Sequence, residues 1–191
     1  MKKVIFLLVV FLQLQNLAAV ERGKTAASGP RFSLTALAGL RAFANNDFKQ
    51  IYKGSQAAFG LELGYRLGRK IEVFVSGDHL AATGELTHTR EATSFRVIAL
   101  EGGARFALPL GRFVPYAGAG AGYYLVKEEN VIATLDEKKA GFFALGGLRF
   151  RFAKALFAAV QVKIVALKLK PFNESVDLGG WFAGAGIGVT F

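Results

Sequence analysis

Residues 177–191, DLGGWFAGAGIGVTF, form two different faces when the chain is extended, because successive side chains of a β-strand point to opposite sides. Apolar residues from Trp181 to Phe191 occupy one face, and glycines at 184, 186 and 188 dominate the other. A soluble, half-buried strand would place charged or amide groups on its solvent side. Trp181 and Phe191 instead mark the two ends of the apolar face, as interfacial anchors do. The stretch therefore predicts the last strand of a membrane β-barrel.

The start of the chain predicts export. Lys2 and Lys3 precede an apolar run over 4–12, and small residues end the segment at Ala19. This order is typical of a cleaved secretory signal peptide over residues 1–19. A retained membrane anchor is the alternative, but the apolar run is shorter than the ~20 residues that a span requires. Residues 20–30 are predicted to be a flexible periplasmic lead-in, and 31–191 a single transmembrane β-barrel domain.

Composition limits the partners that the chain can have. The formal net charge is +10, and cysteine is absent, which excludes a disulfide framework and a thiolate nucleophile. The Lys and Arg residues are dispersed along strands and turns, so we expect no nucleic-acid partner. The expected anionic partners are outer-membrane lipids and lipopolysaccharide.

The same alternation recurs upstream and predicts an all-β fold of eight antiparallel strands in an up-and-down meander. Short connections alternate with long ones, as periplasmic turns alternate with external loops in outer-membrane barrels. A soluble lipocalin-like barrel would have its apolar face inside, whereas here the charges within strands share the opposite face. The facing of residues 113–127 stays open. The other seven predicted strands cover 31–43, 56–67, a stretch from 71, 94–108, 113–127, 140–150 and 155–168; the short turns are 68–70, 109–112 and 151–154, and the long loops 44–55, 81–93, 128–139 and 169–176.

These patterns, with PYAGAGAGYY at 115–124 and GIGVTF at 186–191, resemble the small eight-stranded outer-membrane barrels of the OmpA and OmpX type. The resemblance implies an integral, porin-like protein of the Gram-negative cell envelope, located in the bacterial outer membrane. It also implies that the barrel-assembly machinery reads a carboxy-terminal signal. The positions that match this signal are Gly186, Ile187, Val189 and Phe191.

Charged residues on the inward face predict a network inside the barrel. An eight-stranded barrel has a lumen just wide enough for side chains, and buried charges are costly unless they are paired. We therefore favour a lumen plugged by paired charges over a proton path. Arg66, Glu72, Arg105 and Arg149 are expected near the periplasmic end, and Glu62, Glu101, Gln161 and Lys163 nearer the middle. The predicted lumen charge network consists of Arg41, Glu62, Arg66, Glu72, Asp78, Glu101, Arg105, Arg149 and Lys163.

No catalytic or metal-binding motif is recognised. His79 and His88 are the only histidines, and they are interpreted as ordinary loop residues. A lipid A deacylase would need His, Ser and an acid held together, and a metal site would need further ligands at suitable spacing. We therefore expect no enzymatic activity, no cofactor and no metal.

Aromatic residues near the predicted strand ends suggest the two girdles of a membrane barrel. Basic residues in the short turns, among them Arg69, Lys70 and Lys154, either meet phospholipid head groups or form an ordinary solvated rim. The predicted interface aromatics are Tyr65, Phe113, Phe150, Trp181 and Phe191.

The sequence favours a structural or surface-interaction role, exerted through the external loops. A narrow passive channel is the first alternative, because inward glycines at 184, 186 and 188 would leave room for a thin water path. A lipid-modifying enzyme is the second. The loop partner and the oligomeric state stay undetermined.

Overall fold

Ten strands make up the secondary structure in the part of the chain that the computed structural model describes, residues 31–44, 54–85, 92–129, 134–169, 176–177 and 179–191. No helix among these residues has the length and apolarity that crossing a membrane requires. The strands are β1 (Phe32–Phe43), β2 (Ser55–Arg66), β3 (Ile71–Glu85), β4 (Ala92–Ala107), β5 (Phe113–Glu129), β6 (Thr134–Arg151), β7 (Leu156–Ala166), β8 (Lys168–Leu169), β9 (Val176–Asp177) and β10 (Gly180–Thr190).

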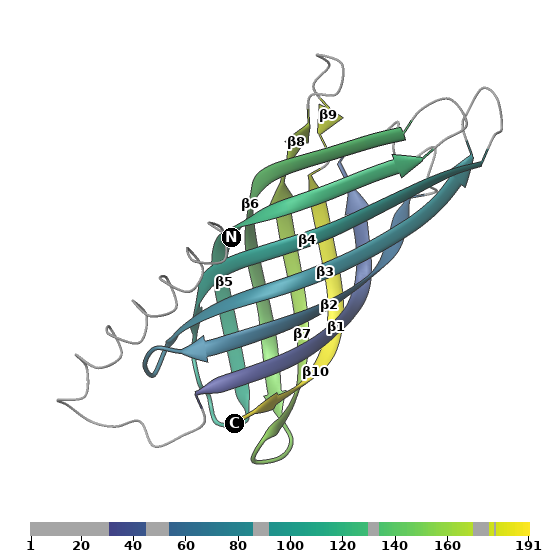
Figure 1. Ribbon diagram of the computed structural model, residues 1–191. Coiled ribbons are helices and arrows are strands. Elements are labelled where there is room, and N and C mark those ends of the chain that lie inside the picture. Colours follow the sequence, from purple (N-terminus) through teal and green to yellow (C-terminus); the bar gives the residue numbers. More distant parts are fainter. Residues whose placement is uncertain (1–30, 45–53, 86–91, 130–133, 170–175, 178) are drawn as a thin grey trace.

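Eight of these strands close into an antiparallel barrel in the order β1-β10-β7-β6-β5-β4-β3-β2 (Figure 1). The predicted up-and-down meander is thereby confirmed. Closure comes from the pairing of β1 with β10, which runs from Ser33 opposite Thr190 to Phe43 opposite Gly180. β8 and β9 form a separate two-stranded ribbon.

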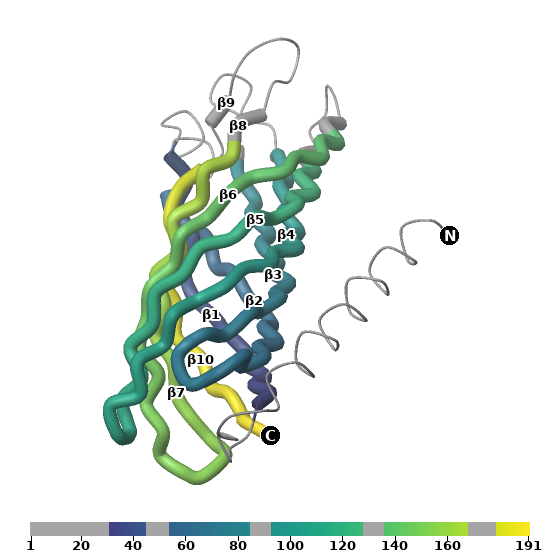
Figure 2. Tube along the Cα trace, turned by 90° about the vertical axis from the view of Figure 1, so that its left-hand side faces the viewer, coloured from purple at the N-terminus to yellow at the C-terminus, as the bar shows by residue number. Residues whose placement is uncertain are grey.

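Tight turns join the strands at one end of the barrel, where β1 begins and the chain ends (Figure 2). In the β4–β5 turn, the backbones of Leu110 and Phe113 exchange hydrogen bonds of 2.8 and 3.1 Å. The turn needs Gly111, whose φ of 62° is strained for residues with a side chain. We call this the short-turn end and the opposite one the long-loop end; in outer-membrane barrels short turns are periplasmic.

Strands β3 to β6 extend further at the long-loop end than the sequence predicted, so two predicted loops need correction. Residues 81–85 continue β3, 92–93 begin β4, 128–129 end β5 and 134–139 begin β6. The predictions of loops at 81–93 and 128–139 were therefore too long. Polar side chains suggested loops there, but the ladder continues with pairs such as Thr83–Ser94, since polar residues are compatible with a strand that leaves the apolar layer.

Two smaller corrections concern the end of the chain. Lys168–Leu169 and Val176–Asp177 pair as β8 and β9, so Leu169 and Val176, the two ends of the predicted loop 169–176, are strand residues. Lys168, which was predicted in the barrel strand 155–168, belongs to this ribbon instead, because β7 ends at Ala166. The last barrel strand begins at Gly180 rather than Asp177. The predicted loop 44–55 lies mostly outside the described residues, and Ser55 already belongs to β2.

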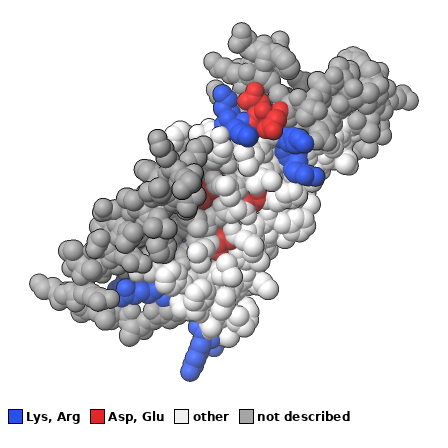
Figure 3. Space-filling model, in the orientation of Figure 1, with Lys and Arg blue, Asp and Glu red and all other residues white. Residues whose placement is uncertain are grey.

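The apolar face of the barrel points outward and the charged face inward, which is the reverse of a soluble barrel. Phe142 is 73% exposed and Ile187 69% exposed on the outer wall, while charged side chains such as Glu62 are buried inside. Figure 3 shows a mainly uncharged band between two ends that carry Lys and Arg atoms. In β5, whose facing the sequence left open, Tyr116 and Tyr124 are buried inside and Tyr123 is exposed outside.

Candidate functional site

Two clusters of charged side chains lie inside the barrel. The inner cluster, nearer the short-turn end, consists of Glu62, Glu72, Arg105 and Arg149 from β2, β3, β4 and β6. Arg105 Nη2 donates to Glu62 Oε1 at 2.6 Å and also to Glu72. Arg149 donates to both oxygens of Glu72, at 2.9 and 2.8 Å. Two buried arginines thus balance two buried glutamates, with short, charge-assisted hydrogen bonds.

The outer cluster is formed around Lys163 on β7. Its ammonium donates to Asp78 on β3 and to Glu101 Oε2 on β4, the latter at 2.5 Å. Tyr124 Oη donates to the other oxygen of Glu101 at 2.8 Å, and Ser76 Oγ donates to Oε2 at 3.4 Å. A single cation is therefore shared by two carboxylates here.

Arg41 lies beside the outer cluster without joining its ion pairs. Its side chain is buried, and the guanidinium carbon lies 5.3 Å from the centroid of Phe43 and 5.8 Å from that of Tyr124. Within the described residues, Nε and Nη2 have no hydrogen-bond partner. Two aromatic rings thus lie against this cation, which takes part in none of the ion pairs found among the described residues.

Seven of the nine predicted network residues contact one another, and they do so as two clusters. Glu62 was expected near the middle of the lumen with Glu101 and Lys163. Its backbone shares a register row with Glu101 through Ser76, but its carboxylate bonds to Arg105 in the inner cluster. Arg66 is half-buried and takes part in none of the ion pairs found among the described residues. Gln161, also expected near the middle, accepts a hydrogen bond from Tyr116 Oη at 3.0 Å.

Aromatic rings fill the space beside the inward glycines, which sequence reasoning missed. A Cβ added to Gly120 would lie 2.6 Å from Phe143 Cζ, and one added to Gly122 would lie 3.2 Å from the ring of Tyr124. The glycines at 184 and 188 likewise face the rings of Phe182 and Phe157. These glycines accommodate rings rather than an open path. The signal was present in the sequence, because Phe182 shares the inward phase of the glycines that follow it.

The same rings lie against the cationic heads. The guanidinium carbon of Arg105 lies 4.9 Å from the ring centroid of Phe74 and 5.0 Å from that of Tyr116. The guanidinium carbon of Arg149 lies 5.0 Å from the ring centroid of Phe157. Cation–π attraction strengthens when the partners are removed from water. The interior is therefore a packed mixture of ion pairs and rings.

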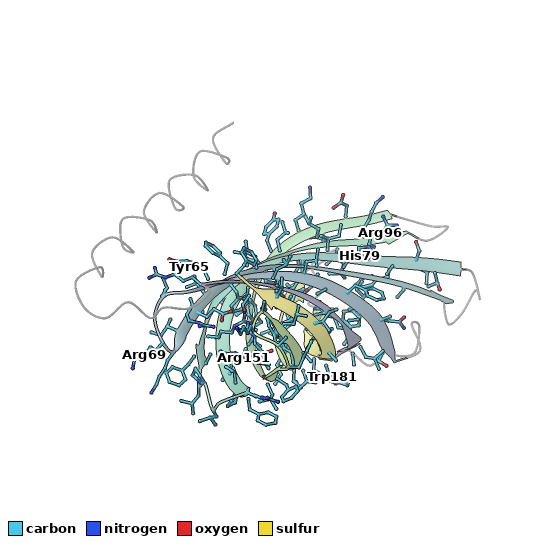
Figure 4. The ribbon with its side chains drawn as sticks, turned by 90° about the horizontal axis from the view of Figure 1, so that it is seen from below. Tyr65, Arg69, His79, Arg96, Arg151 and Trp181 are labelled. Atoms are coloured by element: carbon cyan, nitrogen blue, oxygen red, sulfur yellow. The ribbon has the colours of Figure 1, made fainter. Side chains whose placement is uncertain are left out.

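The histidines do not form a catalytic arrangement in the described part of the chain. His79 lies in β3 between Phe59 and Ile98, with its side chain exposed on the outer wall, so its prediction as a loop residue was wrong (Figure 4). Ser76 and Asp78 lie on the opposite side of the same strand. His88 is outside the described residues. Among the residues described, no group of three or more His, Cys, Asp or Glu side chains is arranged to hold a metal ion.

Aromatic pairs mark the short-turn end. Phe32 lies 4.9 Å from Tyr65 and 5.9 Å from Phe191, and Phe113 lies 5.1 Å from Phe150, measured between ring centroids. Trp181 is exposed on the outer wall near the other end of β10 (Figure 4).

The residues of the expected assembly signal lie on the closing strand. Phe191 exchanges backbone hydrogen bonds of 2.9 and 3.0 Å with Phe32, so it extends the closing pair by one residue beyond β10. Ile187 is exposed on the outer wall, and Gly186 faces inward against the backbone of Ala36.

Several solved structures share this fold. OprG from Pseudomonas aeruginosa has a TM-score of 0.66 at 14% identity, with 85% of this chain and 96% of that chain covered. Neisserial surface protein A has a TM-score of 0.62 at 15% identity, covering 84% and 97%. Ail of Yersinia pestis, crystallised with the heparin analogue sucrose octasulfate, has a TM-score of 0.55 at 16% identity, covering 84% and 99%. These identities show the fold alone.

No curated protein matches the chain. The family model of the outer membrane protein beta-barrel domain matches residues 4–191, nearly the whole sequence. With its closed eight-stranded meander and its apolar outer wall, this chain belongs to that family of bacterial outer-membrane barrels.

Proposed function

We propose that this protein is a closed outer-membrane barrel with a structural or surface-interaction role, exerted through its long-loop end. The observation that carries the proposal is contact between side chains from opposite walls. In the ring of eight strands, β6 lies four positions from β2, and β7 lies four positions from β3. Yet Arg149 on β6 reaches Glu62 on β2 at 3.7 Å, and Lys163 on β7 bonds to Asp78 on β3. Both clusters thus cross the full width of the lumen.

Energetics support closure at rest. Separating Arg149 or Lys163 from its carboxylates would leave charges in a cavity narrow enough to be filled by side chains. Breaking a buried pair by removing one partner costs ~3–5 kcal/mol. A conducting path would require both clusters to open together and the rings beside the glycines to move.

The projecting strands support a role at the long-loop end. Beyond the apolar band, β4, β5 and β6 bring Arg96, Lys127 and Asp136 into one register row, and Lys138 lies two residues further along β6. These side chains are exposed, and Figure 3 shows positive and negative atoms side by side at this end. A paired sheet that carries charges of both signs suits a polar partner. The loops predicted to carry the role lie largely outside the described residues.

Planar-bilayer recording on the refolded full chain tests closure. We expect no sustained conductance. A Glu72→Ala/Arg149→Ala double variant, which removes two central members of the inner cluster, serves as the sensitivity control and should produce current bursts. Uniform steps from the unaltered protein, with an ion preference that changes in Lys163→Glu, would establish a channel instead.

Single-cysteine labelling on intact cells tests the orientation, since the chain has no cysteine of its own. Ser94→Cys, on the projecting part of β4, should react with a membrane-impermeant maleimide. Lys154→Cys, in the β6–β7 turn, is the matched control and should react only after the cells are opened. The reverse pattern would place the short turns outside and end the proposal of an external role for the projecting strands.

A further inference from the structure

Basic side chains surround the short-turn end, and the described residues place no exposed acidic side chain among them. We define the basic rim as Arg31, Arg69, Lys70, Arg112, Arg151 and Lys154. All are exposed except Arg151, which is half-buried. The segments that form this end, 31–34, 64–71, 107–115, 150–156 and 188–191, contain no Asp or Glu. Glu72 follows directly, but it is buried and bonded to Arg105 and Arg149. Within the described residues, the basic rim therefore has no acidic side chain that offsets its positive charge.

The basic rim encircles the barrel. Arg69 and Lys70 lie in the β2–β3 turn, Arg112 in the β4–β5 turn, and Lys154 in the β6–β7 turn, while Arg31 precedes β1 beside the closing seam. Seen from below, the labelled Arg69, in the β2–β3 turn, and Arg151, at the end of β6, lie at separate places on the short-turn end (Figure 4). A protein partner would contact one sector of such a ring. A ligand that contacts every sector is one that surrounds the barrel, namely the lipid leaflet.

The rim also lies at the depth of lipid head groups. The ammonium of Lys70 lies 5.7 Å from the centroid of Phe106, a ring exposed on the apolar wall. The aromatic pairs Phe32–Tyr65 and Phe113–Phe150 lie in the same zone. Aromatic rings beside Lys and Arg mark the boundary between hydrocarbon and head groups. The cations are thus placed where lipid phosphates are found.

The long-loop end differs in this respect. There Arg96, Lys127 and Lys138 share the outward face with Asp136, so charges of both signs are mixed. On the face drawn in Figure 3, red atoms accompany the blue at the long-loop end, and only blue is visible at the short-turn end. Among the described residues, an exposed acidic side chain therefore accompanies the basic ones at the long-loop end but not in the basic rim.

From this asymmetry we infer that the basic rim is a binding surface for anionic phospholipid head groups of the leaflet at the short-turn end. A basic side chain near an anionic membrane surface strengthens binding about fivefold, and salt weakens the attraction. The barrel should accordingly enrich its lipid shell in phosphatidylglycerol over the zwitterionic phosphatidylethanolamine.

The test compares two variants of equal composition in nanodiscs of both lipids. The rim variant is Arg69→Gln/Lys70→Gln/Lys154→Gln, and the control is Arg96→Gln/Lys127→Gln/Lys138→Gln; each removes one Arg and two Lys. Spin-labelled lipids report the relative association constants of the two head groups with the full-length barrel. We expect a severalfold preference for phosphatidylglycerol in the unaltered protein and the control, and a preference near unity in the rim variant.

Equal preferences in the unaltered protein and the rim variant would overturn the inference. Loss of preference in both variants would overturn it too, because net charge rather than the rim would then be responsible. If the rim variant does not insert, a salt titration of the unaltered protein decides the matter. The preference should fall toward unity between about 0.05 and 0.5 M salt, as the Debye length shrinks, and a preference that salt leaves unchanged would refute a head-group charge site.

Discussion

At the scale of single residues, Glu72 holds the inner cluster together. It accepts hydrogen bonds from both Arg105 and Arg149, and all three side chains are buried. The pairs are short, so much of the cost of removing these charges from water is offset by their mutual attraction. Loss of any one member leaves a buried charge in the cluster without its counter-charge.

Glu72→Ala should therefore destabilise the barrel by ~3–5 kcal/mol, because two buried guanidinium groups lose their shared acceptor. Asp136→Ala, which removes an exposed acid on the projecting sheet, should change the free energy of unfolding by no more than about 0.5 kcal/mol. Urea unfolding in lipid vesicles, followed by the heat-dependent gel shift, measures both. Coincident midpoints for the two variants would show that the inner cluster contributes nothing to stability.

Arg41 should behave differently from the paired arginines. Its unpaired nitrogens carry a desolvation cost of ~1–3 kcal/mol, which contact with Phe43 and Tyr124 offsets by up to about 2 kcal/mol. Arg41→Met should thus change stability by less than about 1 kcal/mol. Arg105→Met, which removes an ion-pair partner of Glu62 and Glu72, should lower the free energy of unfolding by ~3–5 kcal/mol in the same urea series. A larger loss for Arg41→Met than for Arg105→Met would contradict the assignment.

At the scale of strands, adjacent glycines on opposite faces have opposite roles. A Cβ on Gly103 would lie 2.5 Å from Ala119 O and 3.1 Å from Phe74 Cζ, whereas one on Gly102 meets nothing closer than 3.7 Å. Close backbone approach therefore requires Gly103 but not Gly102.

Gly103→Ala should accordingly cost ~1–3 kcal/mol through overpacking, and Gly102→Ala should be neutral or slightly stabilising. Thermal unfolding of the two variants in one detergent tests this. A Gly102→Ala barrel that melts below the Gly103→Ala barrel would show that the inward and outward faces of β4 are misassigned.

The closing strand has a second expected role, in assembly. Phe191 pairs with Phe32 through two backbone hydrogen bonds and carries an exposed ring at the barrel's edge. Deleting Phe191 should lower the folded fraction in the outer membrane severalfold, because the closing pair is shortened and the terminal aromatic is lost. The fraction that shows the heat-dependent gel shift is the readout, and deletion of the exposed Leu110 side chain by Leu110→Ala is the control. Wild-type yield from the truncated chain would remove the assembly role.

The period-2 pattern predicted the strands wherever apolar residues alternate with small or charged ones, as in 56–67 and 155–168. It failed at 81–85 and 134–139, because strands that project into water have polar residues on their outer side and look like loops. It also could not group the charges. Glu62 was assigned by its distance from a turn, but strand tilt and the lengths of Arg105 and Arg149 decide which charges meet across the lumen. The pattern also could not predict that Phe143 and Tyr124 pack against glycines, because that contact depends on how the side chains are arranged in the folded barrel.

At the scale of the whole molecule, the barrel combines a neutralised interior with unlike ends. The inner cluster contains two acids and two bases, so positive charge accumulates on the surface rather than in the lumen. The basic rim lies at the short-turn end, and a mixed-charge sheet projects at the other. The described part of the barrel thus carries different charge patterns at its two ends, whatever the external loops bind.

The seam, the pairing of β1 with β10, also affects the order in which the strand pairs form during folding. Every other pair joins neighbouring barrel strands along the chain, with only the β8–β9 ribbon between β7 and β10, whereas the seam joins Ser33 to Thr190. Local hairpins form early, and contacts between distant positions form late, because the intervening chain must first be ordered. Until the seam closes, β1 and β10 are two unpaired edges, and open edges invite pairing with another chain. Misassembly is thus most favoured just before the last step of folding. Fast pairing of β10 with β1 would shorten the time during which the two edges are open.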